Sequence, residues 1–466
     1  MRRPQHISIT GVLALVVLAA CVSPPQPPPI PPSAVIGVRD AQLTPDYWIA
    51  RDANSRRIVL DAEAIAAQNA RLRELDPSVH DLENLPQMLA GADVKQWIET
   101  LSSRPDKTLY DDQGRALSAS MLDALMNSIA LDAVPPTQPT RYGLVVRRAD
   151  LRTFPTLMRV FDSRDSTDID RFQESALFPG TPVAIVHESR DRHWWFVVSP
   201  LYSAWIEKSF VAEGSAEQVL EYTRRKPYLV VTGPTVKTVF TPERPEVSEL
   251  QLDMGVRVPV LADWPPSKLV NGQHPYTAHV IELPTRAADG SLRFAPALLP
   301  KTADTASDYL PLSQANVVRQ GFKFLGERYG WGHSYNARDC SGFVSEVYRS
   351  FGVQLPRNTR DQATSPALNR IVFTSADDHA RRVAVLRELD VGDLIYIPGH
   401  VMMVIGHDDG MPYVIHDTTG ISYRDGTGSV RRVALNGVSV TPLSPLLLGK
   451  DQPLVDRITS ILRVRR

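Results

Sequence analysis

Cys340 is the residue in this chain best placed for nucleophilic chemistry. It follows Asp339, a good N-cap residue, and it precedes apolar residues at helical spacing: Phe343, Val344, Val347, Tyr348 and Phe351. The pattern predicts a helix whose first turn carries the thiol. At that place the helix dipole and unpaired backbone N–H groups favour the thiolate, and the same N–H groups can stabilise an oxyanion.

A base for this nucleophile is offered by two histidines on predicted strands. The strand Leu394–Ile397 and the pair Pro398-Gly399 lead into His400–Gly406, and a polar turn joins that strand to Pro412–Asp417, which contains His416. With pairing centred on Asp408, His400 and His416 lie directly opposite each other; a slip of one residue places Asp417 there instead. Either alignment gives a nucleophile, a base and an orienting group, and with His416 as the orienting residue their order is Cys, His, His.

Metal binding is the main alternative use of these histidines. His400, His407 and His416 are close in sequence, but neither an HExxH pattern nor paired-cysteine spacing accompanies them. We therefore expect no metal and no cofactor.

The elements that must position these residues follow from pattern changes along the 466-residue chain. Residues 40–135 show helical spacing, with Val94, Trp97, Ile98 and Leu101 on one face. Two blocks of short strands follow at 140–222 and 226–298, and the segment with Cys340 spans 305–450. In the first block, Trp194, Trp195, Tyr202 and Trp205 either line a ligand groove or belong to the core.

Composition narrows the function classes. A formal net charge of -1 argues against a nucleic-acid partner. After the N-terminal segment, no hydrophobic run approaches membrane-spanning length. We expect a monomer.

The N-terminus resembles a bacterial lipoprotein signal. Arg2 and Arg3 precede an apolar run that ends in Leu18-Ala19-Ala20-Cys21, similar to a lipobox. The resemblance implies a signal peptide over 1–20, lipid on Cys21 and a proline-rich tether over 21–39. Because Val22 and Ser23 are not acidic, we expect an outer membrane, periplasm-facing location. Cys340 is then the only free thiol in an oxidising compartment.

The region around Cys340 resembles the NlpC family of papain-like wall peptidases. The similarity rests on LGERYGWGHSYNARDCSGFVSEVYRSFGVQLPRNTRDQA, VGDLIYIPGHVMMVIG and YVIHDTTG. It implies a multidomain fold, with an α+β papain-like catalytic domain preceded by two small all-β SH3-like barrels and a helical N-terminal region. It also implies that Cys340 is the nucleophile, His400 the base and His416 the orienting residue.

The same resemblance implies a substrate. Tyr329 is expected near the nucleophile, and Asp339 and Ser341 are expected to hold the free amino group of an N-terminal L-alanine. The bond cut is then that between γ-D-glutamate and the following diamino acid, diaminopimelate or lysine, in peptidoglycan stem peptides. Asp339 has capping as its alternative role.

One residue departs from the family pattern, and two other functions are compatible with the sequence. His333 stands where many relatives have glycine, seven residues before Cys340, so it either crowds the cleft or is a tolerated loop residue. The same scaffold also suits an amidase or a transpeptidase. A non-catalytic wall-binding lipoprotein is the third reading, although such a protein needs neither Cys340 nor the histidines.

Overall fold

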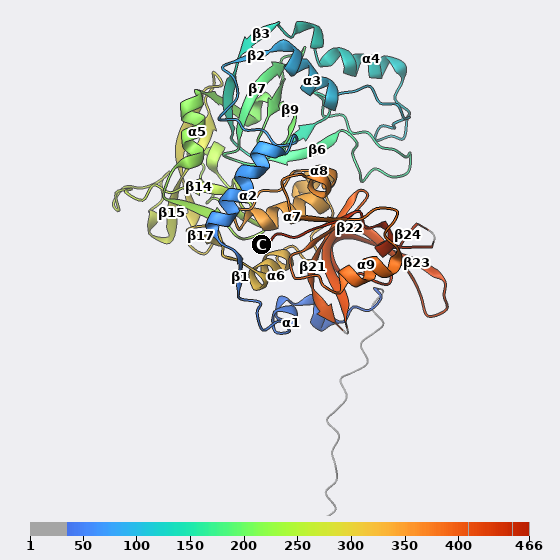
Figure 1. The fold of residues 1–466 in the computed structure, drawn as a ribbon. Coiled ribbons are helices and arrows are strands. Elements are labelled where there is room, and N and C mark those ends of the chain that lie inside the picture. Colours follow the sequence, from blue (N-terminus) through green and yellow to red (C-terminus); the bar gives the residue numbers. More distant parts are fainter. Residues whose placement is uncertain (1–34, 409, 450, 466) are drawn as a thin grey trace, which may run out of the picture.

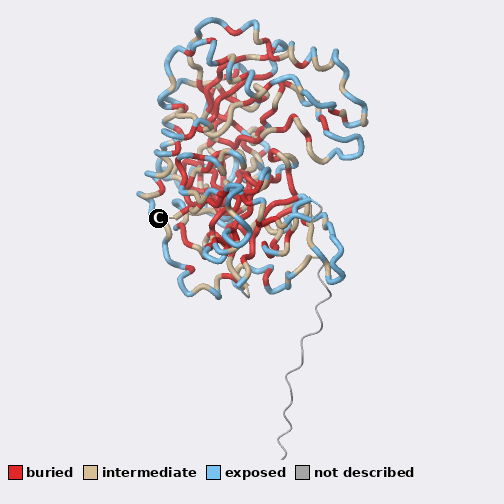
Figure 2. The backbone as a smooth tube through the Cα atoms, turned by 45° about the vertical axis from the view of Figure 1, so that its right-hand side comes forward, coloured by how far each residue is buried: buried red, intermediate tan, exposed pale blue. Residues whose placement is uncertain are grey.

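The computed structural model describes residues 35–408, 410–449 and 451–465. Figure 1 shows a β module at the top, a second β module on the left and a mixed α/β domain below them. Buried backbone concentrates inside all three, while exposed backbone follows the outer loops (Figure 2). Within this described part, no helix combines the length and apolarity needed to cross a membrane. The predicted signal peptide and Cys21 lie outside the described residues.

The predicted helical region 40–135 does not form one unit. It contains η1 (Asp40–Leu43), α1 (Pro45–Ile49), β1 (Ile58–Leu60), α2 (Ala62–Leu75), β2 (Met88–Ala90), α3 (Gly91–Leu101), α4 (Ala119–Ser128) and η2 (Leu131–Ala133). Trp48, Leu60 and Leu72 are buried in the core of the α/β domain, whereas Val94 and Ile98 share a core with the first β module. The spacing predicts the helices correctly. It does not show that the apolar faces of some pack on the α/β domain and those of others on the first β module.

The first β module is a single antiparallel sheet. Its strand order is β10-β4-β7-β8-β9-β5-β6. The strands are β4 (Arg141–Val145), β5 (Ala149–Arg152), β6 (Gln173–Leu177), β7 (Pro182–Glu188), β8 (Trp194–Val198), β9 (Ser203–Glu207) and β10 (Val211–Gly214). Trp194, Trp195 and Trp205 are all buried. The three tryptophans of this aromatic set therefore belong to the core and do not line a ligand groove.

The second β module follows η3 (Lys208–Phe210) and α5 (Ala216–Arg224), and it consists of three small sheets. They are β14-β11-β17, β12-β13 and β15-β16. The strands are β11 (Tyr228–Val231), β12 (Thr235–Lys237), β13 (Gln251–Asp253), β14 (Arg257–Pro259), β15 (Ala278–Arg286), β16 (Leu292–Pro300) and β17 (Thr305–Ala306), with η4 (Pro245–Val247) and η5 (Pro275–Thr277) between them. Since β17 pairs with β11, this module ends after the predicted boundary at 298.

The α/β domain packs helices against a mostly antiparallel sheet, in the order β19-β26-β20-β21-β22-β24-β25 with β23 also on β22. Its helical segments are α6 (Gln314–Phe322), η6 (Trp331–Asn336), α7 (Cys340–Arg349), α8 (Thr359–Thr364), α9 (His379–Leu386) and η7 (Leu454–Arg457). Its strands are β18 (Leu312–Ser313), which pairs with β1, β19 (Arg370–Val372), β20 (Leu394–Ile397), β21 (His400–Asp408), β22 (Met411–Arg424), β23 (Val430–Pro442), β24 (Leu446–Leu448), β25 (Gln452–Pro453) and β26 (Ser460–Leu462).

The predicted end of this domain at residue 450 is wrong. Strand β26 lies between β19 and β20, and Ile461 is fully buried. A short strand near the end of a chain gives no sequence signal for an inner position, because only its partners in the sheet determine that position.

Helix α7 is fixed by its buried face. Phe343, Val344 and Val347 have no exposed surface and share a core with Met403 and Ile415 of the sheet. Burial of each such side chain contributes roughly 1.5–3 kcal/mol, so this packing holds the first turn of α7 in place against β21.

Candidate active site

Cys340 is the first residue of α7, as the sequence predicts. Asp339 is the N-cap, and its carboxylate accepts a hydrogen bond from the Gly342 N–H at 2.7 Å. The N–H groups of Cys340 and Ser341 belong to the first turn, where a helix offers them no backbone acceptor. Two donors therefore lie beside the thiol.

The thiol is enclosed rather than exposed. Cys340 retains 5% of its accessible surface, and its sulfur lies 3.6 Å from the Thr359 hydroxyl. The backbone N–H of Val401, the residue after His400, donates to the same sulfur. This contact places the nucleophile at the beginning of strand β21.

The protonation of this thiol differs from the prediction. Burial, and then the negative charge of Asp339, raise the pKa of Cys340 to about 12, although the Thr359 and Val401 contacts act in the opposite direction. The helix N-terminus alone predicts a lowered pKa, but desolvation disfavours the charged thiolate more strongly here. The resting side chain is therefore a neutral thiol.

His400 and His416 form a directly hydrogen-bonded pair. Nε2 of His400 lies 2.8 Å from Nδ1 of His416, and Nε2 of His416 lies 3.0 Å from the Thr441 hydroxyl. Burial lowers the pKa of His400 to about 4, so its imidazole is neutral at physiological pH. The pair leaves Nδ1 of His400 as the ring nitrogen available to a substrate or a thiol.

The pairing of these two strands is not the one predicted. An alignment centred on Asp408 would set Met403 opposite Tyr413, but Met403 pairs with Ile415 and Asp408 pairs with Met411. The turn thus lies after Asp408 and is not centred on it, and a bulge between Val404 and Gly406 changes the offset by one residue. His400 and His416 therefore meet through their side chains and not as a directly opposed pair.

Asp339 has several hydrogen-bond partners within the protein, and its role in binding a substrate ammonium stays a prediction. Nη2 of Arg357 lies 2.8 Å from its Oδ2, and the Gly332 N–H donates to the same oxygen at 3.0 Å. Its Oδ1 accepts from Gly342 N–H at 2.7 Å and from the Ser341 hydroxyl at 3.2 Å. Both oxygens are thus occupied, which supports capping as the role of this carboxylate.

Ser341 belongs to the same buried network. Its hydroxyl accepts from Nη1 of Arg357 at 3.0 Å while donating to Asp339, and only 4% of Ser341 is exposed. Direct contact with a substrate would require this network to open.

His333 is part of the framework and does not project into the cleft. Its Nδ1 accepts from Arg357 at 2.9 Å and its Nε2 donates to Glu346 at 3.1 Å. Burial and the Arg357 charge lower the pKa of His333 to about 4, which keeps the ring neutral. The ring fits because residue 342 is glycine: a Cβ there would lie 2.5 Å from Cε1 of His333.

A second buried arginine ties the second β module to the site. Nη2 of Arg338 lies 2.7 Å from Asp253, and its Nε lies 3.0 Å from Glu346 on α7. All three side chains are almost completely buried. Because an arginine fork needs both partners in place, this network fixes the module relative to α7.

The carboxylate of Glu174, in the first β module, is connected to the thiol by a short chain of side-chain contacts. The Tyr202 hydroxyl donates to Glu174 at 2.5 Å and also contacts Asn358. Asn358 precedes Thr359, whose hydroxyl contacts Cys340. Sequence analysis assigns Glu174, Asn358 and Thr359 no role, although the last two lie in the run LPRNTRDQA that carries part of the family resemblance.

Asp417 is an unexpected group beside this site. It is completely buried, and neither carboxylate oxygen has a hydrogen-bond partner among the described residues. Burial raises the pKa of Asp417 to about 9, so this side chain is neutral at physiological pH. In sequence it directly follows His416.

A cavity of about 800 Å³ opens against the histidine pair. Tyr329, His400 and His416 line one part of it. Tyr329 is buried, and burial followed by the neighbouring Cys340 raises the pKa of its hydroxyl well above the usual value. The predicted position of Tyr329 near the nucleophile is consistent with this arrangement.

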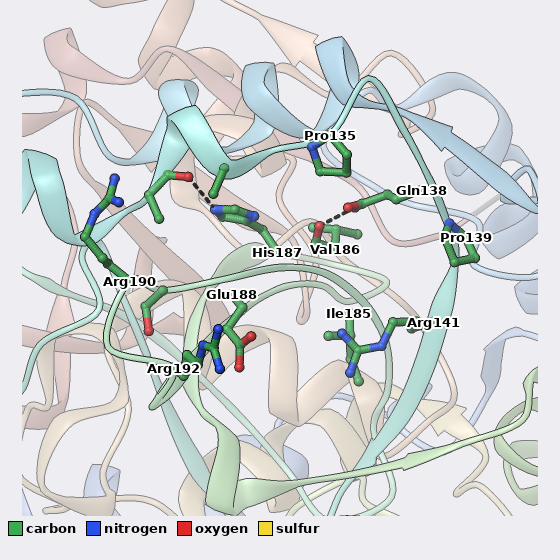
Figure 3. Close-up of a pocket in the computed structure, with 13 residues that line it drawn as sticks. Pro135, Gln138, Pro139, Arg141, Ile185, Val186, His187, Glu188, Arg190 and Arg192 are labelled. Atoms are coloured by element: carbon green, nitrogen blue, oxygen red, sulfur yellow. Dashed lines mark hydrogen bonds between the residues drawn. The ribbon is translucent and has the colours of Figure 1, made fainter.

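A different cavity, of about 420 Å³, lies at the first β module (Figure 3). In Figure 3 His187 points to a backbone carbonyl and Gln138 to Val186. Arg141 pairs with Glu213, and Arg190 pairs with Asp132. Its polar groups are therefore largely satisfied by the protein itself, and the hydroxyl of Ser189 in its lining is bonded to Asp191.

Within the described residues, no group of three histidine, cysteine, aspartate or glutamate side chains is arranged to hold a metal ion. The chemistry that this arrangement supports is acyl transfer. A thiol, an imidazole held in orientation by a second imidazole, and free N–H groups lie together at the beginning of α7.

Comparison with known proteins agrees with this geometry. Residues 326–438 match the NlpC/P60 family, and residues 159–207 match the SH3 domain of the SH3b1 type. A Bacillus cereus protein named gamma-D-glutamyl-L-lysine dipeptidyl-peptidase is 28% identical over 224 residues, which is 47% of this chain and 54% of that protein. The match thus spans about half the length of this relative.

A solved structure from Photobacterium shows the same fold. An NlpC/P60 endopeptidase from Photobacterium damselae subsp. piscicida superposes with a TM-score of 0.70 at 16% identity, covering 88% of this chain and 94% of that one. An NlpC/P60 family protein from Bacillus cereus has a TM-score of 0.46 at 19% identity, covering 70% of this chain and 100% of the other. The chain described here therefore carries an NlpC/P60 domain preceded by an SH3 domain of the SH3b1 type.

Proposed function

We propose that this protein is a cysteine peptidase that hydrolyses the bond between γ-D-glutamate and the following diamino acid in peptidoglycan stem peptides. Cys340 is the nucleophile, His400 the base and His416 the residue that orients it. The observation that carries the proposal is the contact of the Cys340 sulfur with the N–H of Val401, next to a His400 ring held by His416. The relative from Bacillus cereus supports the bond type.

The protonation states of the site fit a base-assisted attack. Neutral His400 donates from Nε2 to Nδ1 of His416, and His416 in turn donates from Nε2 to the Thr441 hydroxyl, an assignment made from the hydrogen-bond chain. Nδ1 of His400 is then unprotonated and can take the thiol proton as Cys340 attacks the γ-carbonyl. His416 stabilises the imidazolium that forms.

The remaining steps use the first turn of α7. The N–H groups of Cys340 and Ser341 stabilise the negative oxygen of the tetrahedral intermediate. The imidazolium of His400 then protonates the leaving amine, and an acyl-enzyme remains. Water, deprotonated by His400, hydrolyses this thioester and regenerates the free thiol.

Glu174 is a second candidate, beside the predicted Asp339, for binding the free ammonium end of the substrate. It is half-buried, accepts hydrogen bonds from Thr153 and Tyr202, and is connected through Tyr202 and Asn358 to the residue that contacts the thiol. Glu174→Gln should raise KM for L-Ala-γ-D-Glu-containing peptides by about tenfold, and N-acetylation of the substrate should remove the difference between the two proteins. An equal loss on acetylated substrate would exclude this role.

Mass spectrometry of defined muropeptides incubated with protein lacking residues 1–21 tests the main proposal. Release of L-Ala-γ-D-Glu by this protein, and not by its Cys340→Ala variant, is the expected result. Cleavage at the amide between glycan and L-alanine would instead indicate an amidase, and transfer to an added amine would indicate a transpeptidase.

We propose further that lipid on Cys21 anchors the protein to the outer membrane, facing the periplasm. The first described residues are bound to the catalytic domain, since Gln42 and Tyr47 donate to Asp408 at 2.7 and 2.8 Å. A tether from Cys21 would thus hold the domain itself near the membrane. Labelled palmitate should be incorporated into the full chain and not into Cys21→Ala; equal labelling would contradict the proposal.

A further inference from the structure

The cavity beside the histidine pair extends well beyond it. One wall follows strand β22 from His416 to Ser422 and continues onto Val430 and Arg432 of the neighbouring strand β23. Ser422 and Arg432 are direct partners in the sheet. In Figure 1, β22 and β23 reach outward together at the right of the molecule. The cavity therefore has room for a peptide segment on the His400 side of the scissile bond.

The lining of this cavity combines apolar groups with polar ones, among them Thr418, Thr419 and Ser422. Ile397, Ile421 and Leu446 to Leu448 contribute hydrocarbon surface. Asp451 also lines the cavity, but its carboxylate is paired with Arg424. A ligand would thus meet hydrocarbon surface that suits methylene groups, beside hydroxyl groups that can form hydrogen bonds.

Arg432 is the one charged group of this lining that lacks a partner in the described part of the chain. Its neighbour Arg431 pairs with Asp425 at 2.7 Å and does not line the cavity. Arg432 is exposed to solvent at the cavity, and an unpaired guanidinium there attracts a carboxylate, which it can bind through two parallel hydrogen bonds.

We propose that this cavity binds the part of the substrate that leaves with the amine, and that Arg432 binds a carboxylate of this part. The inference rests on the proposed function, in which His400 protonates the leaving amine and must therefore face it. The carboxylate is either that of a diaminopimelate side chain or the C-terminus of the peptide. Lysine has the same side-chain ammonium as diaminopimelate but lacks its second carboxylate, so a lysine peptide without a nearby C-terminal carboxylate binds less well.

Binding to the inactive Cys340→Ala protein tests this assignment without turnover. Calorimetry with the tripeptide L-Ala-γ-D-Glu-diaminopimelate should show a Kd about five- to tenfold higher when Arg432→Ala is added. Arg431→Ala is the matched control and should leave Kd unchanged, while Arg432→Lys should restore part of the affinity. An unchanged Kd in the Arg432→Ala protein overturns the proposal.

Two amidated tripeptides identify which carboxylate is bound. Amidation of the side-chain carboxyl, or of the C-terminal carboxyl, should weaken binding to the parent protein, and the weakening should disappear in the Arg432→Ala background. If neither amide changes binding, Arg432 does not bind the substrate. Failure of the peptidase proposal is a separate result, because it appears as absence of cleavage by the protein with Cys340 intact.

Discussion

The guanidinium of Arg357 lies 2.8 Å from the carboxylate of Asp339, the residue that caps the helix of Cys340. Its Nε also donates to Ser175 of the first β module at 2.6 Å. One buried arginine therefore connects the SH3 domain to the first turn of α7. The position of the nucleophile depends on the position of that module as well as on its own helix.

Replacement of Arg357 by lysine should reduce both stability and activity. A lysine keeps the charge but cannot contact Asp339, Ser341 and Ser175 together, so buried acceptors lose their donors. We expect a loss of about 2–4 kcal/mol in the free energy of unfolding, measured by denaturant titration, and a lower kcat. Arg360→Lys, at an exposed neighbouring position, should change neither quantity.

The Cys340 thiol should react slowly with alkylating agents at neutral pH. Because the pKa of the thiol is about 12, the reactive thiolate is rare at pH 7, and its fraction increases tenfold with each pH unit. The rate of modification by iodoacetamide, followed by mass spectrometry, should therefore rise continuously up to pH 10. A plateau below pH 8 would show instead that the helix N-terminus dominates, as the sequence alone predicts.

His400 should be required for turnover and dispensable for folding. His400→Asn removes the base next to the thiol, and we expect kcat/KM to fall by at least about 10³-fold. His407→Asn is a control from the same strand, since the ring of His407 contacts only a backbone carbonyl at 3.4 Å among the described residues. If both variants retain activity, His400 is not the base.

Local pattern was enough to predict most elements that carry the site. The predicted strand Leu394–Ile397 has the bounds of β20, and the cap at Asp339 is confirmed. Apolar periodicity and capping act over a few residues, so they can be recognised in sequence. The roles of Cys340, His400 and His416 stay predictions, although the structure brings the three close together.

Long-range polar contacts were not predictable in the same way. The pairing of Asp339 with Arg357 is one example, because Arg357 lies 18 residues away and no spacing rule connects the two. The strand register differs from the prediction because Asp408 pairs with Met411, so the turn is not centred on Asp408, and the bulge near Val404 changes the offset by one residue.

Asp417 gives the molecule an unusual dependence of stability on pH. Its pKa is raised from 3.8 in the unfolded chain to about 9 in the folded one, so the folded state holds the proton more tightly. Below pH 4 the carboxyl is protonated in both states, so its ionisation does not affect the free energy of unfolding. As the pH rises from 4 to 9, the Asp417 carboxyl ionises only in the unfolded state. This ionisation stabilises the unfolded state, so the free energy of unfolding falls.

Asp417→Asn should therefore stabilise the protein, and the gain should grow with pH. We expect roughly 2–5 kcal/mol at pH 8 and little difference at pH 4, from denaturant unfolding at several pH values. Asp425→Asn offers a control of opposite sign, because hydrogen bonds from Thr427 and the pairing with Arg431 lower the pKa of Asp425 in the folded state. A constant difference between parent and Asp417→Asn across this range would show that the carboxyl ionises normally and that a group or water in its surroundings satisfies it.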